Sequence, residues 1–219
     1  QRFRFLFTEP WLFDIPLSAT LEAYNWVRDY DDYDRDSKGG QIRMGYPLLD
    51  YTRGYLSYAY DESEIKDVDE DFQSVIDEGR FTESSIAGSL VYDSRDSTIN
   101  PTEGSKHKLG LQFAGIGGDV GFFKATGELG KYFPLLWSTV GFLHAEGGYV
   151  TEAAGKLLPD YDKFYLGGIN TLRGFDWRDV SVLDEDGNQV GGDMFVQFNA
   201  EFIFPIVTEA GFLGLLFYD

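Results

Sequence analysis

The sequence predicts an all-β fold, specifically an antiparallel transmembrane β-barrel fragment of about ten strands. Three observations support this prediction. Apolar and polar residues alternate along a series of segments, aromatic residues gather near the ends of these segments, and short connections alternate with mostly longer ones. A period of two is that of a strand with one apolar face. Aromatic belts and this alternation of connection lengths are typical of barrels that cross a membrane.

The alternation places ten strands along the chain. Their approximate ranges are 1–8, 17–28, 39–46, 51–60, 83–95, 105–114, 120–132, 137–150, 192–204 and 210–219. The clearest apolar faces are, in chain order, Phe3, Phe5 and Phe7, then Leu17, Ala19, Leu21 and Ala23, then Ile42 and Met44, then Leu109, Leu111 and Phe113, then Phe123, Ala125 and Leu129, and finally Met194, Val196, Phe198, Ala200, Phe202 and Phe204. On a soluble β-sandwich such Phe-rich outer faces would be an aggregation hazard. We therefore expect them to face lipid.

The connections fall into two sets. The short ones, each holding a Pro, are 9–16, 47–50, 97–104, 134–136 and 205–209. The others are 29–38, 61–82, the tight 115–119 and the long 151–191. The aromatic residues near the strand ends are Trp11, Phe13, Tyr46, Tyr51, Tyr132, Phe133 and Trp137.

The chain begins and ends inside predicted strands, so the sequence reads as a piece of a larger barrel. Lipid cannot satisfy the backbone groups of an open strand edge. We expect either an open, distorted sheet or edge-to-edge self-association between copies.

Composition excludes several classes of function. The net charge of −19 argues against a nucleic-acid partner, which requires a basic face. The absence of Cys excludes disulfides, thiolate zinc sites and thiol catalysis. Acids crowd 29–36 and 61–78 without calcium-loop spacing, and we expect two solvated loops there. His107 and His144 lack ligand spacing and are expected to be strand-face residues, so we predict no metal site, no cofactor and no enzyme.

The long connection before the ninth strand carries the most informative motif, at 161–175. Its sequence is Tyr-Asp-Lys-Phe-Tyr-Leu-Gly-Gly-Ile-Asn-Thr-Leu-Arg-Gly-Phe. A loop this apolar must pack on something, and the barrel lumen is the available surface. Gly167, Gly168 and Gly174 would allow tight turns. An Arg173 placed in the lumen would need carboxylate partners.

Two acids are candidates for those partners. Glu201 lies on the polar face of the ninth strand, together with Gln197 and Asn199. Asp219 ends the tenth strand, and its facing is less certain from the sequence.

Three further motifs accompany Gly167, Gly168, Leu172, Arg173, Gly174 and Phe175. These are Thr8-Glu9-Pro10-Trp11-Leu12, then Asp93, Arg95 and Asp96 followed by Pro101 and Gly104, and finally Phe164-Tyr165-Leu166 directly before the two glycines. Together they resemble the outer-membrane protein assembly factors, the surface-antigen or BamA-type barrel superfamily, over essentially the whole chain. Without the resemblance, the motif of Asp93, Arg95 and Asp96 predicts a network of ion pairs that stabilises a turn, at the rim of the barrel that carries the short turns.

The resemblance implies how this chain would fit a larger protein. Residues 1–219 would be strands four to thirteen of a sixteen-strand barrel in the outer membrane, with the long loop folded inward. Glu201 and Asp219 would be the acids that pair with the family's loop arginine. The N-terminal POTRA repeats, and the seam through which client strands are thought to enter, would lie outside this chain.

The resemblance also implies a function. The protein would fold and insert β-barrel clients into the outer membrane, with accessory lipoproteins bound through the POTRA repeats and with lipid and lipopolysaccharide around the barrel. Two alternatives stay open: a two-partner-type secretion transporter of the same superfamily, and a passive porin barrel. The first shares the loop motif, whereas a porin would lack its Arg-Gly-Phe element.

Overall fold

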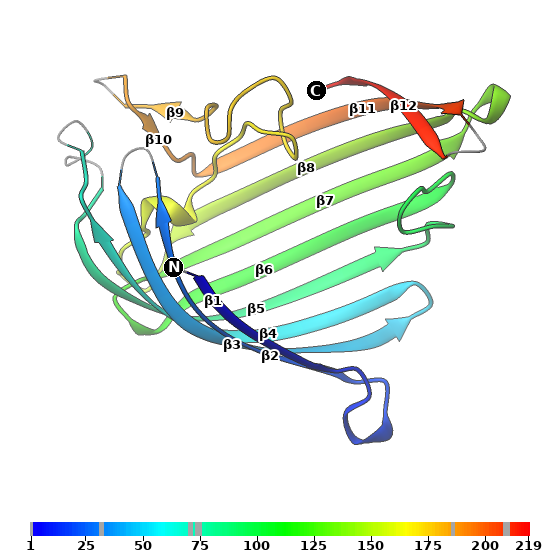
Figure 1. Cartoon of the computed structure of the whole chain (residues 1–219). Coiled ribbons are helices and arrows are strands. Elements are labelled where there is room, and N and C mark those ends of the chain that lie inside the picture. The colour runs from blue at the N-terminus through cyan, green and yellow to red at the C-terminus, as the bar shows by residue number, and fades with distance from the viewer. Residues whose placement is uncertain (1, 31–32, 70–71, 73–75, 185–186, 208–210) are drawn as a thin grey trace.

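The computed structural model describes residues 2–30, 33–69, 72, 76–184, 187–207 and 211–219. Ten strands form one antiparallel sheet whose order is β1-β2-β3-β4-β5-β6-β7-β8-β11-β12 (Figure 1). Their bounds are β1 Arg2–Glu9, β2 Ser18–Asp29, β3 Asp34–Leu49, β4 Thr52–Lys66, β5 Gly79–Asp93, β6 Gly104–Gly118, β7 Phe122–Pro134, β8 Val140–Glu152, β11 Met194–Val207 and β12 Phe212–Tyr218. All ten predicted strands are therefore present. The start of the last one, at residue 210, lies outside the described residues.

The sheet curls into an open trough rather than a closed barrel (Figure 1). Among the described residues, β1 pairs only with β2 and β12 pairs only with β11. The expected open sheet is thus confirmed. Strands that pair in this sheet follow one another in the chain as hairpins, except β8 and β11, which the long loop joins.

The two faces of the sheet differ as the alternation predicts. The convex face is apolar and uncovered: Phe3, Val196 and Phe198 expose 63%, 66% and 68% of their surface. The opposite face of β11 is polar and covered, with Gln197 at 3% and Asn199 at 8% exposure. An apolar outer face and a polar inner face are the arrangement of a barrel immersed in lipid.

Two predicted loops are shorter than the sequence suggested. β3 begins at Asp34 rather than near 39, and β4 continues to Lys66 rather than ending near 60. The acids of 29–36 and 61–78 were expected to be solvated loop residues, and this is wrong for those that lie in strands. The physical reason is cross-strand charge pairing, which favours the extended pairing. The pairs are Lys66 with Asp36 at 3.0 Å, Lys38 with Glu62 at 2.8 Å, and Arg80 with Glu64 at 3.1 Å.

Two of the short connections contain a single 3-10 turn, at Leu12–Asp14 and Leu136–Ser138. No helix among the described residues is long and apolar enough to span a membrane.

The loop of residues 153–193, which joins β8 to β11, lies on the concave side of the sheet (Figure 1). It contains a 3-10 turn at Asp160–Asp162 and a small hairpin formed by β9 Val182–Leu183 and β10 Gln189–Val190. Two buried apolar clusters lie beneath its first half. One consists of Ala114, Val120, Phe122, Val150 and Leu158, and the other of Tyr33, Ile65, Val68 and Ile76. The wall and the loop therefore share a packed core, and the loop is held close to the strands.

Candidate functional site

The loop is first fixed to the wall by Phe164. Its backbone pairs with Gly192, near the end of the same loop, in both directions at 2.9 and 2.8 Å, and its ring packs 4.8 Å from that of Phe195 on β11. The ring also lies over Gly148 of β8, where a Cβ atom would be 2.5 Å from the Phe164 Cζ atom. Glycine at 148 thus leaves the space in the wall that the ring occupies, as aromatic residues over strand glycines do elsewhere.

Three glycines then return the chain toward the wall, as the sequence suggested. Gly167, Gly168 and Gly174 have φ angles of 111°, 95° and 93°. These angles are accessible to glycine and costly for other residues. The Thr171 hydroxyl closes the turn, because it accepts from the Gly167 amide at 2.9 Å and donates to the Gly167 carbonyl at 2.8 Å. The result is a tight loop that presents Arg173 to the sheet.

Arg173 meets both predicted acids. Its Nη1 donates to Oε1 of Glu201 on β11 at 2.6 Å, and its Nε donates to Oδ2 of Asp219 at 2.8 Å. Nη2 donates to the other oxygen of Asp219, and the backbone amide of Arg173 reaches Oδ2 at 2.9 Å. The guanidinium also lies 3.9 Å from the centroid of the Phe217 ring. We call Arg173, Glu201 and Asp219 the first anchor.

The first anchor is largely shielded from water. The side chains of Arg173, Glu201 and Asp219 expose 16%, 17% and 6%. The hydrogen bonds that Arg173 donates to Asp219 raise the pKa of Arg173 above its ordinary value, so this residue is charged at any physiological pH. Two carboxylates on a fork-shaped cation give charge-assisted, directional bonds. Removing one partner would leave a half-buried charge unpaired.

Two residues of this site were missed as contributors by the sequence reading. Asn199 donates through Nδ2 to Asp219 at 2.9 Å and to the Thr171 carbonyl at 3.1 Å, and its Oδ1 accepts from His144 Nδ1 at 2.7 Å. Phe217 supplies the ring beneath the guanidinium. Both lie two positions before an anchor acid in the same strand run, so the period of two places them on the acids' face. This alternation along each strand was the sequence signal that could have identified Asn199 and Phe217.

The other motif residues occupy different surroundings. Leu172 is half-buried beside Arg173, whereas Phe175 is 53% exposed. In the turn between β5 and β6, Arg95 binds both oxygens of Asp93, at 2.8 and 2.7 Å. Asp96 caps the same turn and accepts from the Thr102 amide at 2.8 Å.

Two residues complete this turn. Gly104 has a φ of 101°, and a Cβ there would overlap the Ser94 carbonyl. Pro101 is half-buried. Two contacts connect this turn to neighbouring strands: the Asp93 amide donates to the Tyr51 carbonyl at 2.8 Å, and Arg95 interacts with Tyr132 of β7.

The histidines lie on strands, as expected. His144 on β8 contacts Asn199 and approaches Glu128 to 3.7 Å, while His107 on β6 stacks on Tyr92 at 5.6 Å. Within the described ranges, no group of three acidic, His or Cys side chains is arranged to hold a metal ion.

Comparison with known proteins identifies the family. The Omp85 superfamily domain matches residues 1–219. The chain is 33% identical over 218 residues to outer membrane protein assembly factor BamA of Nitratidesulfovibrio vulgaris, covering 97% of this chain and 28% of that protein. It is 36% identical over 118 residues to the sorting and assembly machinery component 50 homolog of Bos taurus, covering 53% of this chain and 25% of the relative.

A solved structure is similar over most of the sheet. The crystal structure of BamA from Haemophilus ducreyi lacking POTRA domains 1–3 matches with a TM-score of 0.80 at 20% sequence identity, covering 93% of this chain and 45% of that one. At this identity the likeness shows the fold alone. The chain spans roughly a quarter of the length of its sequence relatives. It belongs to the Omp85 superfamily and is part of an outer-membrane β-barrel.

Proposed function

We propose that this chain is part of an insertase that folds β-barrel proteins and inserts them into the outer membrane. The observation that carries the proposal is the first anchor: a loop arginine held in the concavity by acids of two successive wall strands, β11 and the end of β12. The names of two relatives, an outer membrane protein assembly factor and a component of a sorting and assembly machinery, support it.

The first anchor would serve this activity by fixing the inside of the barrel. A loop tied to β11 and β12 keeps these strands at a set spacing while other parts of the barrel open to a client. Clients would add strands at an exposed edge by β-augmentation, in which backbone groups supply the affinity. The proposal requires no catalytic residue and no cofactor, because the free energy comes from the folding of the client in the bilayer.

The partners follow from the same proposal. The apolar convex face would contact the lipid bilayer, and the long-connection rim would meet lipopolysaccharide. Unfolded β-barrel clients would be the substrates. Accessory lipoproteins would bind POTRA repeats of the full-length protein.

A reconstitution assay tests the proposal. The full-length protein that contains this chain is placed in liposomes, and an unfolded outer-membrane barrel is added as the client. We expect faster client folding, seen as a heat-modifiable band on a gel, and a rate at least about tenfold lower with Arg173→Ala. Liposomes that fold the client no faster than empty ones would refute the insertase activity. If they instead pass a soluble secreted passenger into the lumen, the secretion transporter is the correct reading.

A further inference from the structure

The loop of residues 153–193 makes a second charged contact with the wall, far along the sheet from the first. Arg35, near the start of β3, places its guanidinium carbon 3.6 Å from the centroid of the Tyr161 ring. A cation this close to an aromatic face is attracted by the ring quadrupole, and the attraction strengthens when water is excluded. Arg35 exposes only 13% of its side chain.

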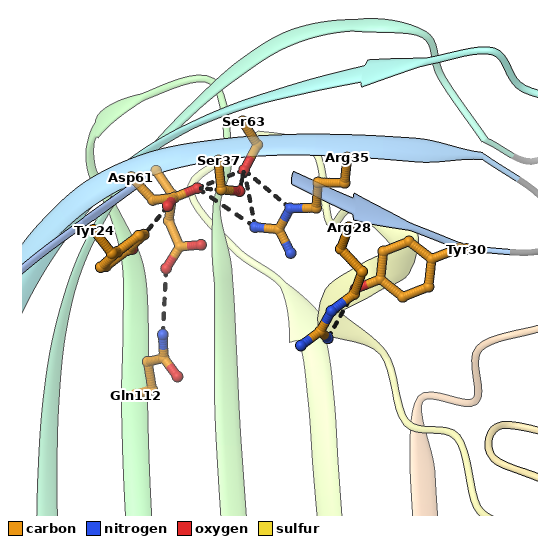
Figure 2. Close-up of polar contacts among 9 residues, drawn as sticks. Tyr24, Arg28, Tyr30, Arg35, Ser37, Asp61, Ser63 and Gln112 are labelled. Carbon is orange, nitrogen blue, oxygen red and sulfur yellow. Dashed lines mark hydrogen bonds and ion pairs between the residues drawn. The ribbon is translucent and has the colours of Figure 1, made fainter. Parts of the chain in front are cut away.

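The wall strands hold Arg35 through contacts that do not involve the loop. Its Nε and Nη2 both donate to the Ser63 hydroxyl, at 3.1 and 2.9 Å, and Nη2 reaches Asp61 at 3.4 Å (Figure 2). Asp61 is fixed in turn by the Tyr24 hydroxyl at 2.7 Å and contacts Ser37 (Figure 2). All these partners lie on β2, β3 and β4, so the orientation of the guanidinium plane does not depend on the loop.

Tyr161 is held from other directions as well. It packs against the buried cluster of Tyr33, Ile65, Val68 and Ile76. The next residue, Asp162, accepts through its carbonyl from Lys124 of β7 at 2.6 Å. Together these contacts fix the 3-10 turn at Asp160–Asp162 to the wall strands β3, β4 and β7.

We propose that Arg35, Asp61, Ser63 and Tyr161 form a second anchor, and that residues 161–173 of the loop are a strap across the concave face held independently at Tyr161 and at Arg173. The first anchor ties the strap to β11 and the end of β12, and the second ties it to β3 and β4. The arginine belongs to the loop at the first anchor and to the wall at the second. No residue belongs to both anchors.

Such a strap has a mechanical consequence. In the strand order β3 and β12 are seven places apart, with six strands between them. A curled sheet fixed at two distant points cannot flatten between them without releasing one anchor. Arg35 and Tyr161 are therefore positioning residues that set the curvature of this part of the wall. The inference concerns conformation and does not rest on the insertase activity.

Amide hydrogen exchange in the full-length protein in lipid nanodiscs tests the strap. Each end has protected amides of its own: Asp162, Lys163 and Phe164 at the second anchor, and Gly168, Thr171 and Arg173 at the first. We expect Arg35→Gln to raise exchange about tenfold in peptides covering 160–166 and to leave 167–175 unchanged. Arg173→Gln should do the reverse.

Conservative variants separate the stack from general folding. Tyr161→Phe keeps the ring and should exchange like the unmodified protein, whereas Tyr161→Leu should match Arg35→Gln. Arg43→Gln is the matched control, because Arg43 lies on the same face of β3 and its guanidinium carbon lies 4.1 Å from the centroid of the Tyr55 ring on β4, a wall residue rather than a loop residue. It should change neither peptide.

Three outcomes would overturn the proposal. The first is unchanged exchange of 160–166 in Arg35→Gln, and the second is equal exchange in Tyr161→Phe and Tyr161→Leu. The third is opening of both peptides together in either arginine variant, which would show a single cooperative lock. If Arg35→Gln fails to fold, Tyr161→Leu provides the same comparison from the loop side.

Discussion

One carboxylate oxygen of Asp219 accepts two hydrogen bonds from Arg173: Oδ2 accepts from the backbone amide at 2.9 Å and from Nε at 2.8 Å. The side chain and the main chain of one loop residue are thus held by a single carboxylate. Since the amide is fixed as well, a change of side chain alone leaves part of the contact. The place of the loop tip is therefore fixed by a backbone hydrogen bond as well as by charge pairing.

The first prediction concerns Gly148, the wall position beneath Phe164. A Cβ at 148 would lie 2.5 Å from Phe164 and 2.8 Å from Phe195, so Gly148→Ala must push one of the two rings aside. We expect a loss of about 1–3 kcal/mol in the stability of the docked loop, which is typical of overpacking. Hydrogen exchange of the Phe164 amide measures it. Gly127→Ala is the control, because nothing lies within 4 Å of a Cβ there. Equal exchange in the two variants would contradict this account.

The second prediction concerns Asn199, which joins His144, Thr171 and Asp219. Asn199→Ala leaves the His144 donor and one oxygen of Asp219 with one bond fewer in a covered site. We expect a cost of about 1–3 kcal/mol, the usual penalty for an unsatisfied buried polar group. The readout is the protease sensitivity of the loop in the full-length protein.

Asn199→Asp should cost more than Asn199→Ala, because it sets a further carboxylate against Asp219. An Asn199→Asp protein whose loop resists protease as well as the unmodified one would show that this residue does not orient the first anchor.

The third prediction is a pH dependence that arises from Asp162 in the loop. Burial, followed by the negative charge of Glu83, raises the pKa of Asp162 to about 7, and the positive charges of Lys124 and Arg35 oppose this while Asp61 adds to it. The docked loop therefore holds a proton that the undocked loop releases at lower pH. Stability contributed by this proton is full at low pH and falls as the pH rises toward about 7.

We accordingly expect the protection factors of residues 160–166, in which the intrinsic pH dependence of amide exchange is divided out, to fall between about pH 4 and pH 7. Asp162→Asn should flatten this profile at the protected level, whereas Asp176→Asn, a change at an exposed loop acid, should leave it intact. A profile that persists in Asp162→Asn would assign the titration to another group.

Much of this architecture could be predicted from the sequence, because a lipid-facing wall imposes a strict period of two. All ten strands and the inward Glu201 follow from that period. The ends of β3 and β4 do not, since acids such as Asp36 and Glu62 read as loop residues until their partners Lys66 and Lys38 are placed opposite them. Pairing between strands is a property of register, which a single segment does not reveal.

The second anchor was beyond prediction for a similar reason. Arg35 and Tyr161 are 126 positions apart in the sequence, and no sequence pattern indicates that they are in contact. Only the folding of the loop onto β3 and β4 brings them together.

The central claim, that paired charges hold the loop tip in the concavity, is tested most directly by a double-mutant cycle. The measurement is the opening free energy of residues 167–175 by hydrogen exchange in the full-length protein and in its Arg173→Ala, Glu201→Ala and doubly substituted forms. We predict that each single change lowers this free energy by about 1.5–3 kcal/mol and that the double change costs clearly less than the sum, because the partners share one interaction. Additive costs, with a coupling energy near zero, would contradict the account.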